Sequence, residues 1–123
     1  MSIYDEKMNR SFVTLPSFLA KWQAIGLTDE DMRRLEQELL INPKVGSVMR
    51  GTGRARKMRF AFENRGKSGS ARVIYIDFEV YELIYFVDVY AKDKKANLSK
   101  SEQNDMKQLV DLIELAIERD VRR

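Results

Sequence analysis

The stretch ARVIYIDFEVYELIYFVDVYA, residues 71–91, is rich in β-branched and aromatic side chains, which favour the pleated backbone of a strand. Residues 71–78 and 83–91 each have the length of one strand. Only residues 79–82 separate them, so we predict two neighbouring antiparallel strands joined by a short connection.

Residues 55–62, ARKMRFAF, continue this pattern upstream, because apolar residues alternate there with basic or small ones. Every second residue from Met58 is apolar, and Lys57, Arg59 and Ala61 fall on the opposite face. Residues 63–70, ENRGKSGS, have the composition of a turn. We therefore predict a meander of three antiparallel strands.

Helical patterns flank the meander on both sides. We predict a short strand at residues 10–15, RSFVTL, and a helix over residues 16–25, where apolar residues recur at helical spacing. A second helix begins after the N-cap residue Thr28 and ends before Pro43. Residues 99–102 have capping-box spacing, and the apolar stripe that follows predicts a C-terminal helix.

This order of elements predicts an α+β fold, formed by residues 1–123 as a single domain. We expect the helices to pack on one face of the sheet. The other face would then be free or only partly covered.

Composition excludes several kinds of site. The chain has no Cys, so it forms no disulfide and no thiolate metal centre. It has no His, so the commonest general base and metal ligand are missing. We expect no metal and no cofactor. No apolar stretch is long enough to span a membrane, and residues 1–10 are polar, so we expect a cytoplasmic protein.

The positive charge is unevenly distributed. The chain has 22 Lys and Arg against 19 Asp and Glu, but between residues 50 and 72 the only acid is Glu63. The basic residues there are Arg50, Arg54, Arg56, Lys57, Arg59, Arg65, Lys67 and Arg72. If those on neighbouring strands converge on one face, they form a surface suited to a phosphodiester backbone. The alternative is the ordinary solvated face of an antiparallel sheet.

Three further features each have a functional and a structural interpretation. Tyr75, Tyr85 and Tyr90 could stack on bases, although aromatic residues are also common packing residues in strands. Trp22, at helical spacing, is expected in the core. The glycines of residues 51–53 could form an anion nest, or only a loop.

The run GTGRARKMRFAFENRGKSGSARVIYI, residues 51–76, followed by YFVDVYAKDKKANLSKSEQ, residues 85–103, resembles the RelE/ParE toxin superfamily. The similarity is greatest to the HigB-type and phage-derived toxins. LTDED at residues 27–31 and NPKVG at residues 42–46 match as well, so the resemblance extends over roughly residues 15–112.

The resemblance implies a RelE-like fold and a toxin of a type II toxin–antitoxin system. Such toxins are ribosome-dependent mRNA endoribonucleases, which cleave mRNA in the ribosomal A site and are inhibited by a cognate antitoxin. Their basic catalytic positions on the strands correspond to Lys57, Arg59 and Arg72, and a basic position after the last strand corresponds to Lys92. The family's late tyrosine has no match, because Leu98 or Ser99 falls near its position.

A metal-independent mechanism suits these residues. RNA is cut when its 2′-hydroxyl attacks the adjacent phosphate, and cations stabilise the charge that develops. Arg59 and Arg72 are expected to clamp the phosphate, because guanidinium groups bind it bidentately. Lys57 is the candidate base. Further RNA contacts are expected from Arg54, Arg56, Lys67 and Lys92.

Two other functions remain open. A ParE-like toxin shares the fold but inhibits DNA gyrase and cuts no RNA. A non-catalytic nucleic-acid-binding protein of a phage would bind RNA or DNA in a salt-sensitive way, without arresting growth.

Overall fold

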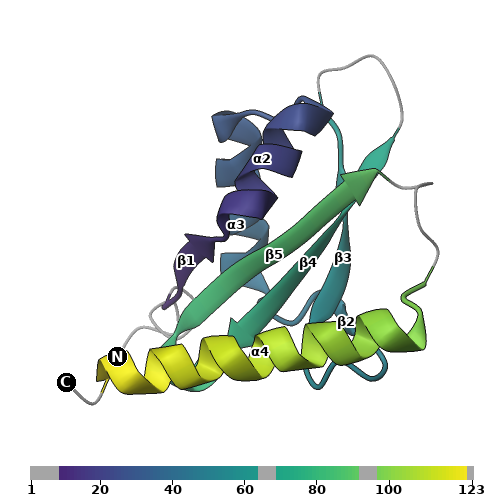
Figure 1. Ribbon diagram of the computed structural model, residues 1–123. Helices are drawn as coiled ribbons and strands as arrows, with labels where there is room; N and C mark the ends of the chain where they lie inside the picture. Colours follow the sequence, from purple (N-terminus) through teal and green to yellow (C-terminus); the bar gives the residue numbers. More distant parts are fainter. Residues whose placement is uncertain (1–8, 64–68, 92–96, 122–123) are drawn as a thin grey trace.

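The computed structural model describes residues 9–63, 69–91 and 97–121, which form one mixed β-sheet flanked by helices (Figure 1). Five strands are hydrogen-bonded in the order β1-β5-β4-β3-β2. The element order confirms the predicted α+β fold: a strand, two helices, an antiparallel set of strands and a C-terminal helix.

The predicted meander forms the centre of the sheet. It consists of β3 (Arg56–Ala61), β4 (Ser70–Phe78) and β5 (Leu83–Ala91), each antiparallel to the next. The short connection between β4 and β5 contains a 3-10 turn, η1 (Glu79–Tyr81), and Glu82 follows it in the left-handed conformation. β4 is buried along most of its length because it lies between two strands and beneath helices on both faces.

The two edges of the sheet differ from the simple meander. β1 (Ser11–Thr14) pairs in parallel with the first half of β5, and the neighbouring Arg10 donates to Asp77 of β4 at 2.8 Å. On the other edge, β2 (Ser47–Val48) pairs antiparallel with β3. The sequence pattern missed β2 because two residues are too few to show alternation.

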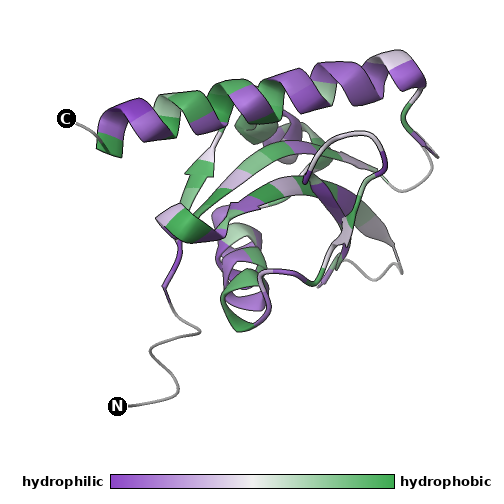
Figure 2. Ribbon diagram, turned by 90° about the horizontal axis from the view of Figure 1, so that it is seen from below, coloured by the Kyte–Doolittle hydropathy of each residue, from purple (hydrophilic) through white to green (hydrophobic). Residues whose placement is uncertain are grey.

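The expectation that all helices pack on one face was wrong. α2 (Pro16–Ile25) and α3 (Asp29–Ile41) cover one face, and α4 (Lys100–Val121) crosses the other (Figures 1 and 2). Two separate apolar clusters result, because successive residues of each strand point to opposite faces. α4 crosses one end of the strands only, and it leaves the end that carries Ala61, Ser70 and Ala91 uncovered (Figure 1).

The helix starts follow the predicted capping chemistry. The Thr28 hydroxyl accepts from the Asp31 amide at 3.1 Å, and the Asp31 carboxylate accepts from the Thr28 amide at 2.9 Å. Ser99 and Glu102 form the same reciprocal pair at the start of α4. Among the residues that the structure describes, no helix combines the length and apolar character needed to cross a membrane.

Candidate nucleic-acid interface

The strand register places three predicted basic residues on one face of the sheet. Arg59 of β3 lies directly opposite Arg72 of β4, and Lys57 lies opposite Ile74. Their neighbours Met58 and Phe60 belong to the apolar cluster on the opposite face, under α2 and α3. The side chains of Lys57, Arg59 and Arg72 therefore share the face that α4 only partly covers.

The pairing of Arg59 with Arg72 places two positive charges side by side, which is electrostatically unfavourable when no anion is bound. Like charges directly opposite each other on neighbouring strands destabilise a sheet. Within the described residues, neither guanidinium forms an ion pair with a carboxylate. Arg72 donates instead to the hydroxyl of Ser70 at 3.0 Å, and this bond fixes its direction on the strand. Two neighbouring guanidinium groups without a carboxylate between them are suited to bind an external anion such as phosphate.

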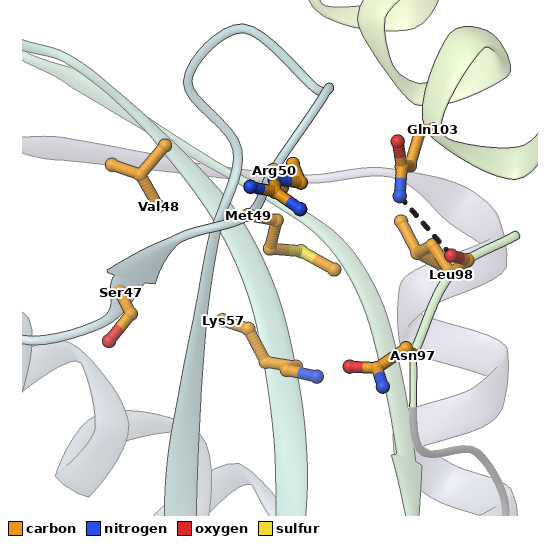
Figure 3. A pocket seen from close by; sticks show the side chains of 8 residues that line it. All are labelled: Ser47, Val48, Met49, Arg50, Lys57, Asn97, Leu98 and Gln103. Carbon is orange, nitrogen blue, oxygen red and sulfur yellow. Dashed lines mark hydrogen bonds between the residues drawn. The ribbon is translucent and has the colours of Figure 1, made fainter. Parts of the chain in front are cut away.

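A groove continues this cationic surface towards α4. It has a volume of about 530 Å³ and lies between β2, the start of the following loop, Lys57 and the beginning of α4 with the segment that leads into it. In Figure 3 the Lys57 side chain points across the groove towards Asn97, and Arg50 lies at its rim. The residues that line it are Ser47, Val48, Met49, Arg50, Lys57, Asn97, Leu98 and Gln103.

Two of the arginines that were predicted to bind RNA have partners within the protein. Arg54 forms an ion pair with Glu114 of α4 at 2.5 Å, and its guanidinium lies 4.7 Å from the centre of the Phe78 ring. Arg56 donates to the carbonyl oxygens of Gly46 at 2.7 Å and Lys44 at 3.3 Å. Because Arg56 is adjacent to Lys57 on the strand, it points to the opposite face. These contacts give both arginines a structural role in this fold.

Lys67, in the loop between β3 and β4, and Lys92, after β5, lie outside the described residues, as does Arg65.

The aromatic candidates separate by burial. Tyr75 is fully buried, and its hydroxyl donates to the Pro43 carbonyl at 2.8 Å and accepts from the Gly46 amide at 2.9 Å, so it does not stack on a base. Burial raises the pKa of this phenol. Trp22 is in the core, as predicted. Tyr90 is half-buried and lies opposite Arg72 on β5.

The glycine-rich loop is organised by Thr52 rather than open as a nest. Thr52 is buried, and its hydroxyl donates to the carbonyl of Met49 at 2.7 Å. The glycines on either side of Thr52, Gly51 and Gly53, both have positive φ. Gly51 lies against the side chain of Gln103 in α4.

Sequence reasoning missed two polar residues of the candidate site. Ser70 and Asn97 are polar residues in turn-like segments, and no periodic pattern marks them. Ser70 is two residues before Arg72 on β4, and the packing of the segment before α4 places Asn97 in the groove with Lys57. Within the described residues, no group of His, Cys, Asp and Glu is arranged to hold a metal ion.

The model of the family described as "RelE toxin of RelE / RelB toxin-antitoxin system" matches residues 20–123 of this chain. Among solved structures, the chain is similar to an E. coli RelE toxin with two arginines mutated to alanine, determined in the free state. The TM-score is 0.52 and the sequences are 18% identical, over 71% of this chain and 86% of that one. This likeness shows the fold, and the family match extends over most of the chain. The chain therefore belongs to the RelE toxin family of toxin–antitoxin systems.

Proposed function

We propose that this toxin is a metal-independent endoribonuclease of the HigB-like subtype, which cleaves mRNA in the ribosomal A site and so inhibits translation in the cytoplasm. The observation that carries the proposal is the direct pairing of Arg59 with Arg72, beside Lys57, on the part of the sheet face that α4 leaves open. Opposed cations are costly in the free protein. A phosphate between them removes that cost, so the site is built for a polyanion.

The proposed chemistry breaks one phosphodiester bond. The 2′-hydroxyl oxygen forms a bond to the adjacent phosphorus, and the bond from phosphorus to the 5′-oxygen breaks. Lys57 takes the proton from the 2′-hydroxyl, while Arg59 and Arg72 stabilise the extra negative charge on the phosphate oxygens. Tyr90, the register neighbour of Arg72, is the candidate donor of the proton to the leaving oxygen.

Family membership implies a cognate antitoxin. We propose that an acidic or amphipathic segment of this partner covers the Lys57–Arg59–Arg72 face, because complementary charge favours such docking. Inhibition would then follow from occupation of the phosphate site.

The proposal is tested by inducing the chain in growing cells and mapping new mRNA 5′ ends. Arg72→Ala removes one preorganised donor, so cleavage is expected to fall about 100- to 1,000-fold. The matched control is Arg33→Ala, because Arg33 is an exposed arginine of α3 and lies away from the site. Equal thermal stability of the two variants by circular dichroism shows that the loss is not unfolding.

Undiminished cleavage in Lys57→Ala, Arg59→Ala and Arg72→Ala alike would show that the assigned site is wrong. The same experiment distinguishes the other functions. Continued translation with DNA damage indicates the ParE-like inhibition of gyrase. Salt-sensitive nucleic-acid binding without growth arrest indicates a non-catalytic binding protein.

A further inference from the structure

The groove beside Lys57 has a composition that phosphate binding does not explain. Val48, Met49 and Leu98 supply apolar walls, whereas Asn97 supplies an amide (Figure 3). Apolar walls with a convergent amide are the features that bind a heteroaromatic ring and read its edge. Its volume of about 530 Å³ is that of a small-molecule site.

We propose that this groove holds the nucleobase next to the phosphate bound by Arg59 and Arg72, and that Asn97 selects the base. This inference rests on the proposed ribonuclease function and adds a specificity-determining residue to it. Lys57 connects the two parts, because it lines the groove and is two residues from Arg59 on the same strand face. Two residues of a strand extend about 7 Å, which is within the reach of one nucleotide.

The wall formed by β2 is fixed by hydrogen bonds to Gly46, the residue that precedes it. The Tyr75 hydroxyl holds the Gly46 amide, and Arg56 holds the Gly46 carbonyl. A Cβ on Gly46 would lie 2.9 Å from the Tyr75 ring and 3.0 Å from the Lys57 carbonyl oxygen, so only glycine fits there. The groove therefore exists before a ligand binds.

The opposite wall is fixed by Gln103 of α4. Its side-chain nitrogen donates to the Leu98 carbonyl at 3.3 Å, and the same side chain packs against Gly51, where a Cβ would collide with it. Gln103 is thus occupied in holding the loop and the segment before α4 together. Its amide is not available to read a base.

Asn97 is the amide that remains for recognition. It is exposed, and within the described residues its side chain has no hydrogen-bond partner. An asparagine amide offers one donor and one acceptor side by side, which can pair with the edge of an unstacked base. Such bidentate pairs discriminate between bases by roughly fivefold to more than a hundredfold.

The test maps mRNA 5′ ends after induction of the wild type, Asn97→Leu and Asn104→Leu. Leucine is close to asparagine in size but has no amide. Asn104 is the matched control, because it is exposed on α4 and does not line the groove. We expect a base preference at one position next to the cut in the wild type and in Asn104→Leu. In Asn97→Leu that preference should fall at least about fivefold while cleavage continues at other bases.

Three results would overturn the inference while leaving the ribonuclease function intact. They are a wild type that cleaves with no base preference, an unchanged preference in Asn97→Leu, and a uniform or complete loss of cleavage in Asn97→Leu. The last result would make Asn97 a catalytic or structural residue instead of a selective one. A wild type that produces no new 5′ ends would reject the ribonuclease function itself, and the inference with it.

Discussion

At the scale of the residue, the neighbours of each arginine decide its role. Arg54 is held by Glu114 and the Phe78 ring, and Arg56 is held by backbone carbonyls. Arg59 and Arg72 face each other without a carboxylate among the described residues. All four look alike in the sequence, because each is a base in a stretch with one acid. Only their partners distinguish the two pairs, and the pair without a carboxylate is the one that we propose binds an anion.

Asp31 allows a prediction about pH at the same scale. Burial alone would raise the pKa of its carboxyl, but hydrogen bonds from the Thr28 amide and hydroxyl and from Arg34 outweigh burial and lower it. The stabilisation is therefore fully present above the unfolded-state pKa of about 3.9 and is lost as the pH falls through the lower folded-state value.

We expect Asp31→Asn to reduce the free energy of unfolding by about 0.3–1 kcal/mol at pH 7, because the charge at the start of α3 is lost. The difference from the wild type should shrink towards pH 3. Urea unfolding at the two pH values, followed by the fluorescence of the buried Trp22, measures it. A difference that is constant or grows at pH 3 would contradict this assignment.

At the scale of the element, α4 is the part of the fold whose position was not expected. Its inward residues are Val110, Ile113 and Ile117. They pack on Ile74, Ile76 and Phe78 of β4 and on other residues of the sheet. Leu112 and Leu115 point outward and are 63% and 50% exposed. Periodicity in the sequence revealed the inward stripe of α4, but a stripe does not state which face of a sheet it covers.

Adjacent residues of α4 provide a matched pair of substitutions. Ile113 is 8% exposed, so Ile113→Ala should lower the free energy of unfolding by about 2–5 kcal/mol, through lost burial and a cavity under the helix. Leu112→Ala should change it by less than about 0.5 kcal/mol. Chemical denaturation of both variants measures the two values. Equal effects would mean that α4 does not pack on the sheet in the way described.

At the scale of the whole molecule, the positions of the charged residues are more informative about binding than the net charge of +3. α2 and α3 occupy one face of the sheet and α4 occupies one end of the other. The exposed remainder carries Lys57, Arg59 and Arg72. A polyanion that binds there should release counterions, so its affinity should fall as salt rises.

We expect the logarithm of the affinity for a single-stranded oligonucleotide with 2′-deoxy linkages, which cannot be cut, to fall linearly with the logarithm of the salt concentration. Each phosphate contact contributes about 0.7 to the slope, so losing the one phosphate that both arginines bind, in Arg59→Gln with Arg72→Gln, should reduce it by about 0.7. Arg33→Gln should leave the slope unchanged. Fluorescence anisotropy measures all three proteins, and equal slopes would place the nucleic acid elsewhere.

The sequence by itself determined the local structure of this protein. The strand composition of residues 71–91, the alternation in residues 55–62 and the caps at Thr28 and Ser99 each rest on contacts within a few residues, and all of these elements are present. Alternation also placed Lys57 and Arg59 on one face of their strand, because side-chain direction in a strand is a local property.

Only the tertiary structure decided what lies opposite those residues. The β3–β4 register sets Arg72 against Arg59, α4 covers one end of the second face, and the packing of the segment before α4 brings Asn97 to the groove that Lys57 lines. The same packing engages Arg54 and Arg56 within the protein. These relations join residues far apart in the chain. They depend on how two apolar clusters are packed at once, and no pattern along the sequence encodes that packing.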